Sequence, residues 1–303
     1  MKKLYILSIL GLMSTVAFGQ QHGLYSQYIF NLFTVNPAYA GERDALSTAL
    51  SYRMQWVGFE GAPKTQNFSI HSPLPANNMA VGLTFQNEDI GARSTPSLMG
   101  AYSYKVKLNR SNHLSFALQA GVINYQYHWE KLEYRQSLDP VSFGTEPNKW
   151  VANIDFGVMY ITPKAYVGLS VLGINDAKTI SSHESDARLN TVYNFMAGKM
   201  FQVSREVFIK PSTLVRVSDA GPFQFDLNMS TMFKNKYWLT ATYRYNYGAV
   251  ISGHIYVNDQ FHFGYAYDLP LNGLLANQSG THELFVGYDF NIYKKKAVLP
   301  RKF

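Results

Sequence analysis

Few residues in this 303-residue sequence are arranged for chemistry. The eight histidines are scattered with no i, i+4 pair, and no HExxH, GxSxG, P-loop or EF-hand pattern occurs. The sequence has no cysteine, which excludes thiol redox chemistry and thiolate metal sites. The most suggestive group is His282 and Glu283 with Asp268, because an imidazole and carboxylates can share a proton. A hydrogen-bonded cluster that anchors a loop explains the same three residues more simply.

A catalytic site can also assemble from distant residues. A Ser-His-Asp or Ser-His-Asn site needs its members to meet only in space, so a barrel hydrolase remains an alternative. Nothing in the spacing of the sequence favours it. We therefore expect a protein that is not an enzyme and that needs no metal or cofactor.

The first nineteen residues are typical of a signal peptide. Lys2 and Lys3 form a positive start, residues 4–16 are mostly apolar, and Ala17-Phe18-Gly19 resembles a cleavage site before Gln20. The apolar run is too short to span a membrane. We expect residues 1–19 to be removed and the chain to leave the cytoplasm.

The composition favours a barrel in the outer membrane. Aromatic residues reach 15%, whereas charged residues reach only 16%, well below the ~25% that is usual in soluble domains. No later stretch is long and apolar enough for a helical span. The formal net charge is +7, and much of the excess lies in the basic tail 294–303. A solvated terminus explains this tail better than nucleic-acid binding, so nucleic acid is not an expected partner. Outer-membrane lipid is an expected partner, because a barrel of this kind lies in the outer membrane.

Alternating side chains support the same fold. In residues 46–56 one face is largely apolar, and it carries Leu46, Thr48, Leu50, Tyr52, Met54 and Trp56. The other face carries Ser47, Ala49, Ser51, Arg53 and Gln55. Such a strand suits lipid on one side and a polar lumen on the other. A soluble β-sandwich also alternates, but its polar faces are richer in Lys and Glu.

About fourteen stretches have this character, an even number as a closed bacterial barrel requires. They lie near 46–56, 65–71, 79–87, 97–108, 113–128, 149–160, 164–171, 190–201, 206–217, 222–232, 236–246, 248–257, 260–267 and 282–293. Short and long connections alternate between them, which predicts short periplasmic turns and long external loops. Pro211 interrupts one stretch and indicates a bulge or an edge. We expect an all-β, antiparallel transmembrane barrel over residues 45–293 with a periplasmic tail.

Residues 20–44 precede the first strand and are predicted to form a plug inside the lumen, entered from the periplasmic side. Asn36-Pro37 predicts a turn, while Ala38 and Gly41 permit close backbone approach. The small inward residues of the first strand leave room for such a body. A lumenal Arg53 needs acceptors, so Arg53 and Gln55 are expected to hydrogen-bond the plug. The alternative is a periplasmic tail that binds a neighbouring protein.

Several short motifs, in order, resemble the PorP/SprF family of type IX secretion system membrane proteins from Bacteroidota. They are Ser26-Gln27-Tyr28-Ile29-Phe30-Asn31, Asn36-Pro37-Ala38-Tyr39-Ala40-Gly41, Arg53-Met54-Gln55-Trp56 with Gly58-Phe59 and Gly61-Ala62-Pro63, Pro73-Leu74-Pro75, Phe263 to Asp268, and Ser279 to Glu283. The resemblance spans the whole mature chain. Thr281 stands where the family pattern suggests Ser, and Leu269-Pro270-Leu271 replaces an aromatic-proline stretch, which could alter partner choice.

The resemblance implies an outer-membrane protein that supports export and surface attachment of large adhesins, in gliding and adhesin-secreting bacteria. The implied partners are an adhesin with a type IX C-terminal domain and periplasmic ring or motor components. A plugged barrel suits docking, because aromatic residues often carry interface affinity. The expected docking rim contains Trp56, Phe59, Tyr267, Asp268, His282 and Glu283. The alternative function is a FadL-like transporter of small apolar molecules, since such barrels also carry a plug with an Asn-Pro-Ala turn.

Overall fold

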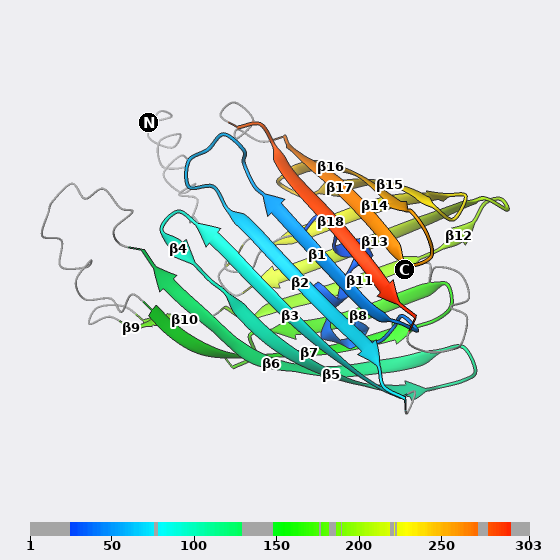
Figure 1. Ribbon diagram of the computed structural model, residues 1–303, viewed down its shortest axis with the longest axis horizontal. Coiled ribbons are helices and arrows are strands. Elements are labelled where there is room, and N and C mark those ends of the chain that lie inside the picture. Colours follow the sequence, from blue (N-terminus) through cyan, green and yellow to red (C-terminus); the bar gives the residue numbers. More distant parts are fainter. Residues whose placement is uncertain are drawn as a thin grey trace, which may run out of the picture.

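The computed structural model describes residues 25–75, 78–128, 148–175, 177–181, 186–188, 190–218, 221, 223–271 and 278–291. The predicted signal peptide, its cleavage site and the tail 294–303 lie outside these residues. The fold is a closed antiparallel barrel of 14 strands (Figure 1). The strands are β1 (Leu46–Met54), β2 (Lys64–Pro73), β3 (Met79–Ile90), β5 (Ser97–Lys107), β6 (His113–Tyr127), β7 (Asn148–Ile161), β8 (Ala165–Leu172), β11 (Val192–Lys199), β13 (Val207–Ser218), β14 (Gln224–Phe233), β15 (Tyr237–Arg244), β16 (Gly248–Tyr256), β17 (Phe261–Pro270) and β18 (Thr281–Phe290).

Four short strands accompany the barrel. β4 (Arg93–Ser94) pairs with the ends of β3 and β6, and β12 (Phe201–Gln202) pairs with β13. A separate hairpin is formed by β9 (Lys178–Ser181) and β10 (Asp186–Arg188). The pairing of β1 with β18 closes the ring. Each expected strand window corresponds to one barrel strand.

The two ends of the barrel differ in the length of their connections. At the turn end, short connections follow β2, β5, β7, β14 and β16. The first strand, β1, begins at this end, and the last strand, β18, ends there. At the loop end lie the segment 55–63 and the longer connections after β6, β8 and β17. The connections after β13 and β15, also at this end, are short, so the expected alternation of short and long connections holds only in part. The names turn end and loop end are used below.

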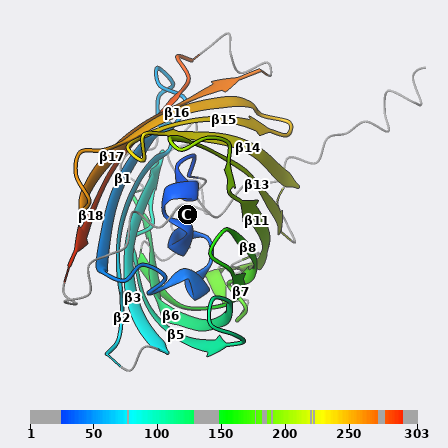
Figure 2. The same cartoon turned by 90° about the vertical axis from the view of Figure 1, so that its right-hand side faces the viewer.

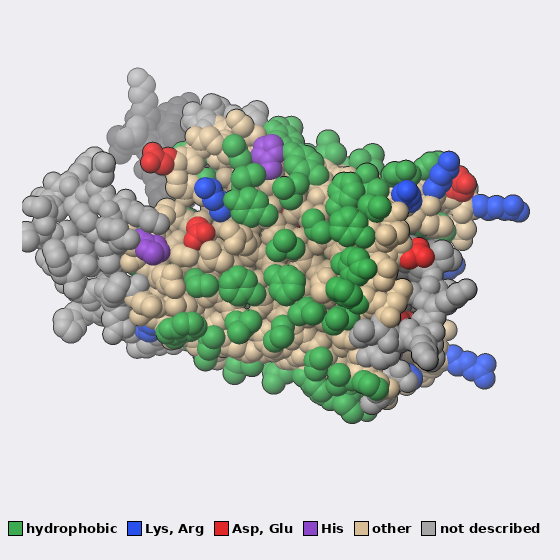
Figure 3. Space-filling view, in the orientation of Figure 1, with side chains coloured by type: hydrophobic (Ala, Val, Ile, Leu, Met, Phe, Trp, Pro, Cys, Tyr) green, Lys and Arg blue, Asp and Glu red, His purple; other side chains and the backbone are tan. Residues whose placement is uncertain are grey.

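An apolar belt covers the outside of the barrel (Figure 3). Outward side chains such as Leu83, Leu118, Leu169, Leu239 and Ile251 are each more than half exposed in the isolated chain. Their inward neighbours are small or polar, because successive side chains of a strand point to opposite faces. A surface of this kind is stable only against lipid, since a soluble protein rarely exposes so large an apolar area.

Pro211 does not bend or end β13, contrary to the expectation of a bulge or an edge. It faces Met229 of β14 in an unbroken register. On the opposite side the neighbouring strand is interrupted instead, because β11 ends at Lys199 and β12 begins at Phe201. Proline has no N–H to donate, so the missing ladder bond is accommodated by this break. The N–H of Met200, at the break, donates to the carbonyl of Lys164.

The N-terminal segment, residues 25–45, lies within the ring of strands (Figure 2). It forms three single 3₁₀ turns, η1 (Tyr28–Phe30), η2 (Leu32–Thr34) and η3 (Pro37–Tyr39). Ile29, Leu32 and Phe33 are each 1% exposed, and they pack among inward apolar side chains of the barrel. None of the helical turns in the described residues is long enough to cross a membrane. The barrel therefore has a lumenal core to which this segment contributes.

Candidate functional site

A buried ion-pair cluster lies in the lumen near the loop end. Arg53 of β1 is directly opposite Glu283 of β18, and Asp268 projects inward from β17. The guanidinium Nη2 is 2.6 Å from Asp268 Oδ2, and Nη1 is 3.0 Å from Glu283 Oε2. All three side chains are at most 1% exposed. Buried charges of this kind are tolerated because each has an opposite charge and hydrogen bonds.

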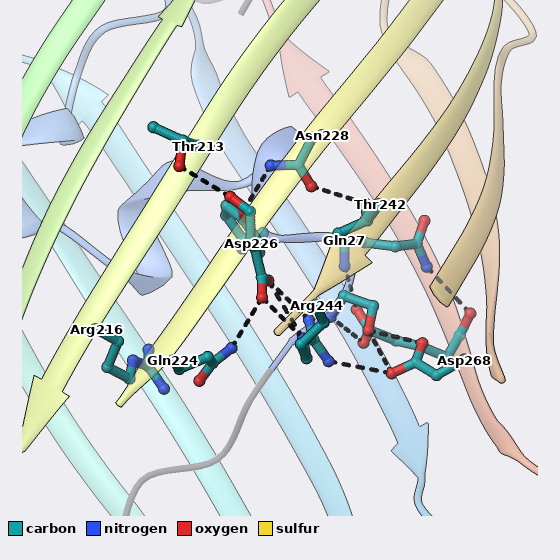
Figure 4. Close-up of polar contacts among 12 residues, drawn as sticks. Gln27, Thr213, Arg216, Gln224, Asp226, Asn228, Thr242, Arg244 and Asp268 are labelled. Carbon is teal, nitrogen blue, oxygen red and sulfur yellow. Dashed lines mark hydrogen bonds and ion pairs between the residues drawn. The ribbon is translucent and has the colours of Figure 1, made fainter. Parts of the chain in front are cut away.

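Two further strands extend this cluster (Figure 4). Arg244 of β15 is opposite Asp226 of β14, and its Nε and Nη2 atoms are each 3.0 Å from that carboxylate. Its Nη1 atom is 3.3 Å from Asp268 Oδ2, so Asp268 lies between two arginines. We call Arg53, Asp226, Arg244, Asp268 and Glu283 the carboxylate–arginine cluster. It joins strands from both sides of the β1–β18 seam.

The first residues of the N-terminal segment bind to this cluster. The Ser26 hydroxyl donates to Asp268, 2.8 Å from each carboxylate oxygen, and accepts from Arg53 Nη1 at 2.8 Å. The backbone N–H groups of Ser26 and Gln27 donate to the two oxygens of Glu283 at 2.7 and 3.0 Å. The Gln27 amide donates to the Glu283 carbonyl. Charge-assisted bonds to buried carboxylates are among the stronger hydrogen bonds in proteins, so they fix the start of the segment.

The Asn-Pro turn binds the opposite wall of the barrel. The Asn36 side chain accepts from the N–H of Ala38 at 2.9 Å, as an N-cap, and Pro37 takes the first position of η3. The same side chain donates to the carbonyl of Leu169 at 3.0 Å. It reaches this wall because Gly157 has no side chain: a Cβ there would overlap Asn36 Oδ1. The turn is therefore held by the shape of the wall as well as by hydrogen bonds.

Small polar residues of the wall pair with carbonyl groups of the segment. The hydroxyl of Ser170 donates to the Val35 carbonyl at 2.6 Å, and that of Ser115 donates to the Ala38 carbonyl at 2.7 Å. Ser103 donates likewise to the Ala40 carbonyl at 3.1 Å. These bonds satisfy buried backbone groups that the short 3₁₀ turns leave open. They also explain why inward barrel positions are small.

A second set of ion pairs holds the segment at the turn end. Glu42 lies 3.0 Å from Lys105 Nζ and 3.0 Å from His113 Nε2, and Arg43 lies 2.9 Å from Asp289. Burial by itself raises the pKa of Glu42. The hydrogen bond from His113 and the charge of Lys105 outweigh burial, and they hold the pKa of Glu42 below its ordinary value. The segment is thus bound at both ends.

The expected plug and lumen residues occupy different surroundings. Asn36 and Ala38 are fully buried in the lumen, together with Pro37 and Gly41, and Arg53 belongs to the cluster. Gln55 has already left β1: it is half-buried in the 55–63 segment, where its N–H donates to the Pro63 carbonyl. Four of the six expected positions therefore belong to the segment itself, Arg53 bonds to its Ser26, and Gln55 alone lies apart.

The expected docking rim divides into two groups. Tyr267 and His282 are half-buried on the outer face near the loop end, where their rings lie 5.2 Å apart. Phe59 is 58% exposed in the segment 55–63. Trp56, in the same segment, has a left-handed backbone (φ 47°). Asp268 and Glu283 are buried in the lumen, so their inclusion in an exposed rim is wrong. They follow Tyr267 and His282 directly in the chain, and alternation turns each to the opposite face.

The sequence did not indicate the partners of this cluster. Ser26, Asp226 and Arg244 were not among the expected site residues. Ser26 and Asp268 are separated by 242 positions in the chain. One available signal was that strict alternation of side chains turns two arginines and three carboxylates to inward faces, where unpaired charge is costly.

The fold of the chain is similar to that of several solved structures. Solved structures that resemble the chain include the CymD monoaromatic hydrocarbon channel, with 10% identity and TM-score 0.48 over 89% of this chain and 93% of that one. The Pseudomonas putida toluene transporter TodX gives 10% identity and 0.48, over 90% and 96%. A Pseudomonas aeruginosa FadL homologue gives 12% identity and 0.46, over 90% and 96%.

Sequence comparison is more specific. No curated protein matches the chain. Residues 17–288 match the family described as type IX secretion system membrane protein PorP/SprF. This range includes the N-terminal segment and almost every barrel residue. The chain therefore belongs to the PorP/SprF family, whose members are outer-membrane components of the type IX secretion system.

Proposed function

We propose that this protein is a plugged barrel that docks an exported adhesin during type IX secretion. In this proposal the N-terminal segment closes the lumen, the loop end faces the cell exterior, and the C-terminal domain of the adhesin binds there. The observation that carries it is the filling of the lumen by a segment bound at both ends. A barrel so filled offers no passage to a polypeptide, whereas its mouth can still bind one.

The loop end offers apolar and aromatic side chains for such a partner. Phe59 is largely exposed, and Tyr267 and His282 form a ring pair with Tyr265 close by. Aromatic residues of this type commonly carry most of the affinity at an interface. We therefore propose Trp56, Phe59, Tyr267 and His282 as the docking surface and leave out the two buried carboxylates.

The turn end is suited to a different partner. Exposed basic side chains collect there, namely Lys107, Arg110, Lys164, Arg205, Lys234 and Lys236. The exposed acidic side chains at this end of the described chain are Asp44, Glu206 and Asp259. Figure 3 shows several of the basic groups projecting beyond the apolar belt. A periplasmic ring or motor component with an acidic surface would complement this end, because charge complementarity speeds and orients association.

The transporter alternative has weaker support from the lumen. A cavity of about 100 Å³ lies on the loop side of the segment. Its lining includes the charged side chains of Glu88, Arg93, Asp155 and Arg216. An apolar solute would have to desolvate these groups without replacing their hydrogen bonds, which opposes binding.

Gene deletion and surface variants test the proposal. Deleting the gene should remove its adhesin from the cell surface while export of other type IX cargo continues. Replacing Phe59, Tyr267 and His282 by Ala should reproduce this loss in a barrel that still shows heat-modifiable mobility. Phe263→Ala is the matched control, because Phe263 lies on the same strand and face as Tyr267 but within the apolar belt.

One result would contradict the docking role: normal adhesin display in the deletion strain, accompanied by loss of uptake of an apolar nutrient. Normal display in the triple rim variant would contradict the proposed docking surface.

A further inference from the structure

The cavity of about 100 Å³ on the loop side of the N-terminal segment is lined by inward side chains of several strands. Pro37 borders it from below. Gly157 of β7 lies against Pro37, and Asp155 and Asn153 follow on the same inward face toward the loop end. The Arg93 side chain, which also lines the cavity, is 26% exposed, so the cavity reaches solvent there. One water molecule needs about 10–15 Å³, so there is room for several waters or for a small organic group.

Asp155 is a buried carboxylate without an opposite charge. It is 5% exposed, and its Oδ1 atom accepts from the N–H of Gly173 at 2.8 Å and from the Asn153 amide at 2.9 Å. Among the residues that the structure describes, no hydrogen bond reaches Oδ2, and no basic side chain lies within ion-pair distance of the carboxylate. Buried charges are ordinarily paired, so this carboxylate is incomplete without a cation or ordered water.

The other charged side chains of the cavity are balanced by neighbours. Arg93 lies 3.9 Å from Glu88. Arg216 projects inward from β13 near Asp226 of the paired strand β14 (Figure 4). It therefore adds a third positive charge beside the three carboxylates of the carboxylate–arginine cluster. Asp155 is the lining residue whose charge these pairings leave uncompensated.

A second acceptor without a donor faces the same cavity. Asn153 is 4% exposed, and its Nδ2 atom donates to Asp155, which turns its Oδ1 atom away from that bond. This oxygen is buried, and no described residue donates to it. Asp155 Oδ2 and Asn153 Oδ1 thus call for hydrogen-bond donors, and one of them also calls for positive charge. Ammonium and guanidinium groups supply both.

We propose that Asp155 and Asn153 form a binding site for an organic cation, an alkylammonium or guanidinium group that reaches the cavity from the loop end. The group can belong to a free amine or to a lysine or arginine side chain of a bound polypeptide. The site itself does not depend on adhesin docking. A polypeptide source would deepen the docking function and rest on it, because a basic residue of the partner would then enter the mouth of the barrel.

A single cysteine can report on occupancy of the site. Thr34→Cys is suitable because Thr34 lines the cavity and the sequence has no cysteine. The purified barrel in detergent is treated with methyl methanethiosulfonate, a small neutral thiol reagent, in the presence of n-butylammonium or n-butanol. We expect n-butylammonium to slow the modification, and n-butanol at the same concentration to have no effect.

Asp155→Asn in the same background keeps the shape of the side chain and removes its charge. It should raise the n-butylammonium concentration needed for protection by about tenfold or more, because a charge-assisted hydrogen bond becomes a neutral one. Glu88→Gln is the matched control, since Glu88 lines the same cavity but already lies beside Arg93. It should change protection much less. Heat-modifiable mobility shows that each variant still forms the barrel.

An internal cation tests the uncompensated charge without any probe. Gln119 of β6 is directly opposite Asp155, so Gln119→Lys brings an ammonium group to the carboxylate. This variant should unfold at a higher temperature than the parent and should lose protection by n-butylammonium. With Asp155→Asn added, the same substitution should lower the unfolding temperature, because the new charge then has no partner.

Two capped peptides distinguish the sources of the cation. Protection by acetyl-Gly-Lys-Gly-amide at least as strong as that by n-butylammonium, with none by acetyl-Gly-Gln-Gly-amide, would assign the site to a polypeptide side chain. Protection by n-butylammonium alone would assign it to a free amine. Equal protection by n-butylammonium and n-butanol, unchanged protection in Asp155→Asn, or no protection by any probe would overturn the proposal and leave the cavity to water. Adhesin display in the deletion strain tests docking separately.

Discussion

Replacing Arg53 by Met should release the start of the N-terminal segment. Arg53 donates to Asp268, Glu283 and the hydroxyl of Ser26, and the substitution leaves two buried carboxylates with fewer partners. Removing one member of a buried ion pair typically costs about 3–5 kcal/mol. Since about 1.4 kcal/mol corresponds to a factor of ten, local opening of the segment should become roughly 10²-fold or more frequent.

Hydrogen exchange of the purified barrel in detergent measures this opening. Peptides that contain Ser26 and Gln27 should exchange faster by that factor in Arg53→Met, while peptides from β6 and β7 should be unaffected. Arg43→Met is the matched control, because Arg43 also pairs with a carboxylate but at the turn end, where the side chains are 11% and 16% exposed. Arg43 pairs with one carboxylate whereas Arg53 pairs with two, so the effect of Arg43→Met should be smaller and confined to the other end of the segment.

A third variant separates loss of the arginine from stranded charge. Adding Asp268→Asn to Arg53→Met removes one uncompensated carboxylate and should recover part of the protection. The reasoning would be refuted if Arg53→Met left the exchange of Ser26 and Gln27 unchanged. It would also be refuted if exchange rose equally throughout the barrel, because the cluster would then stabilise the whole fold and not specifically the bound position of Ser26 and Gln27.

Three further predictions concern the rest of the segment. Gly157→Ala should displace the turn at Asn36, at a cost of about 1–3 kcal/mol, and raise trypsin cleavage of the segment, whereas Gly253→Ala, which has open space around its Cβ position, should not. Ala49→Trp should push the segment outward because its surroundings hold little free volume, and single-channel recordings should show a higher conductance. Because the folded-state pKa of Glu42 is lowered, its contribution is present above its unfolded pKa and lost as pH falls through the folded value. Protection from hydrogen exchange at the turn end, expressed relative to the intrinsic exchange rate at each pH, should therefore fall in acid, and Glu42→Gln should abolish this dependence.

The strands could be predicted from the sequence because alternation is a local property. Leu227 and Met229 are exposed while Asp226 is buried, as the pattern near 222–232 indicated. The same rule, applied strictly, would have separated Tyr267 from Asp268 and His282 from Glu283. Grouping them as one rim followed chain proximity and ignored the two faces of a strand.

The contacts of the N-terminal segment were less accessible to prediction. That Arg53 requires lumenal acceptors follows from the cost of burying a charge, but the identity of Ser26 and Asp268 as partners depends on the closed ring. The direction of the segment, from Ser26 at the loop end to Arg43 at the turn end, is also a property of the whole barrel. No local pattern distinguishes this direction from the reverse one.

The bonds of the segment to both strands of the β1–β18 seam have a consequence for how the barrel forms. These strands are the first and last of the ring, so their pairing carries the largest loop-closure entropy in the fold. Ser26 bonds to Arg53 on one strand and to Glu283 on the other, and it therefore raises the effective concentration of the two edges. We therefore expect the segment to help the ring to close, and a chain lacking it to fold into a closed barrel more slowly.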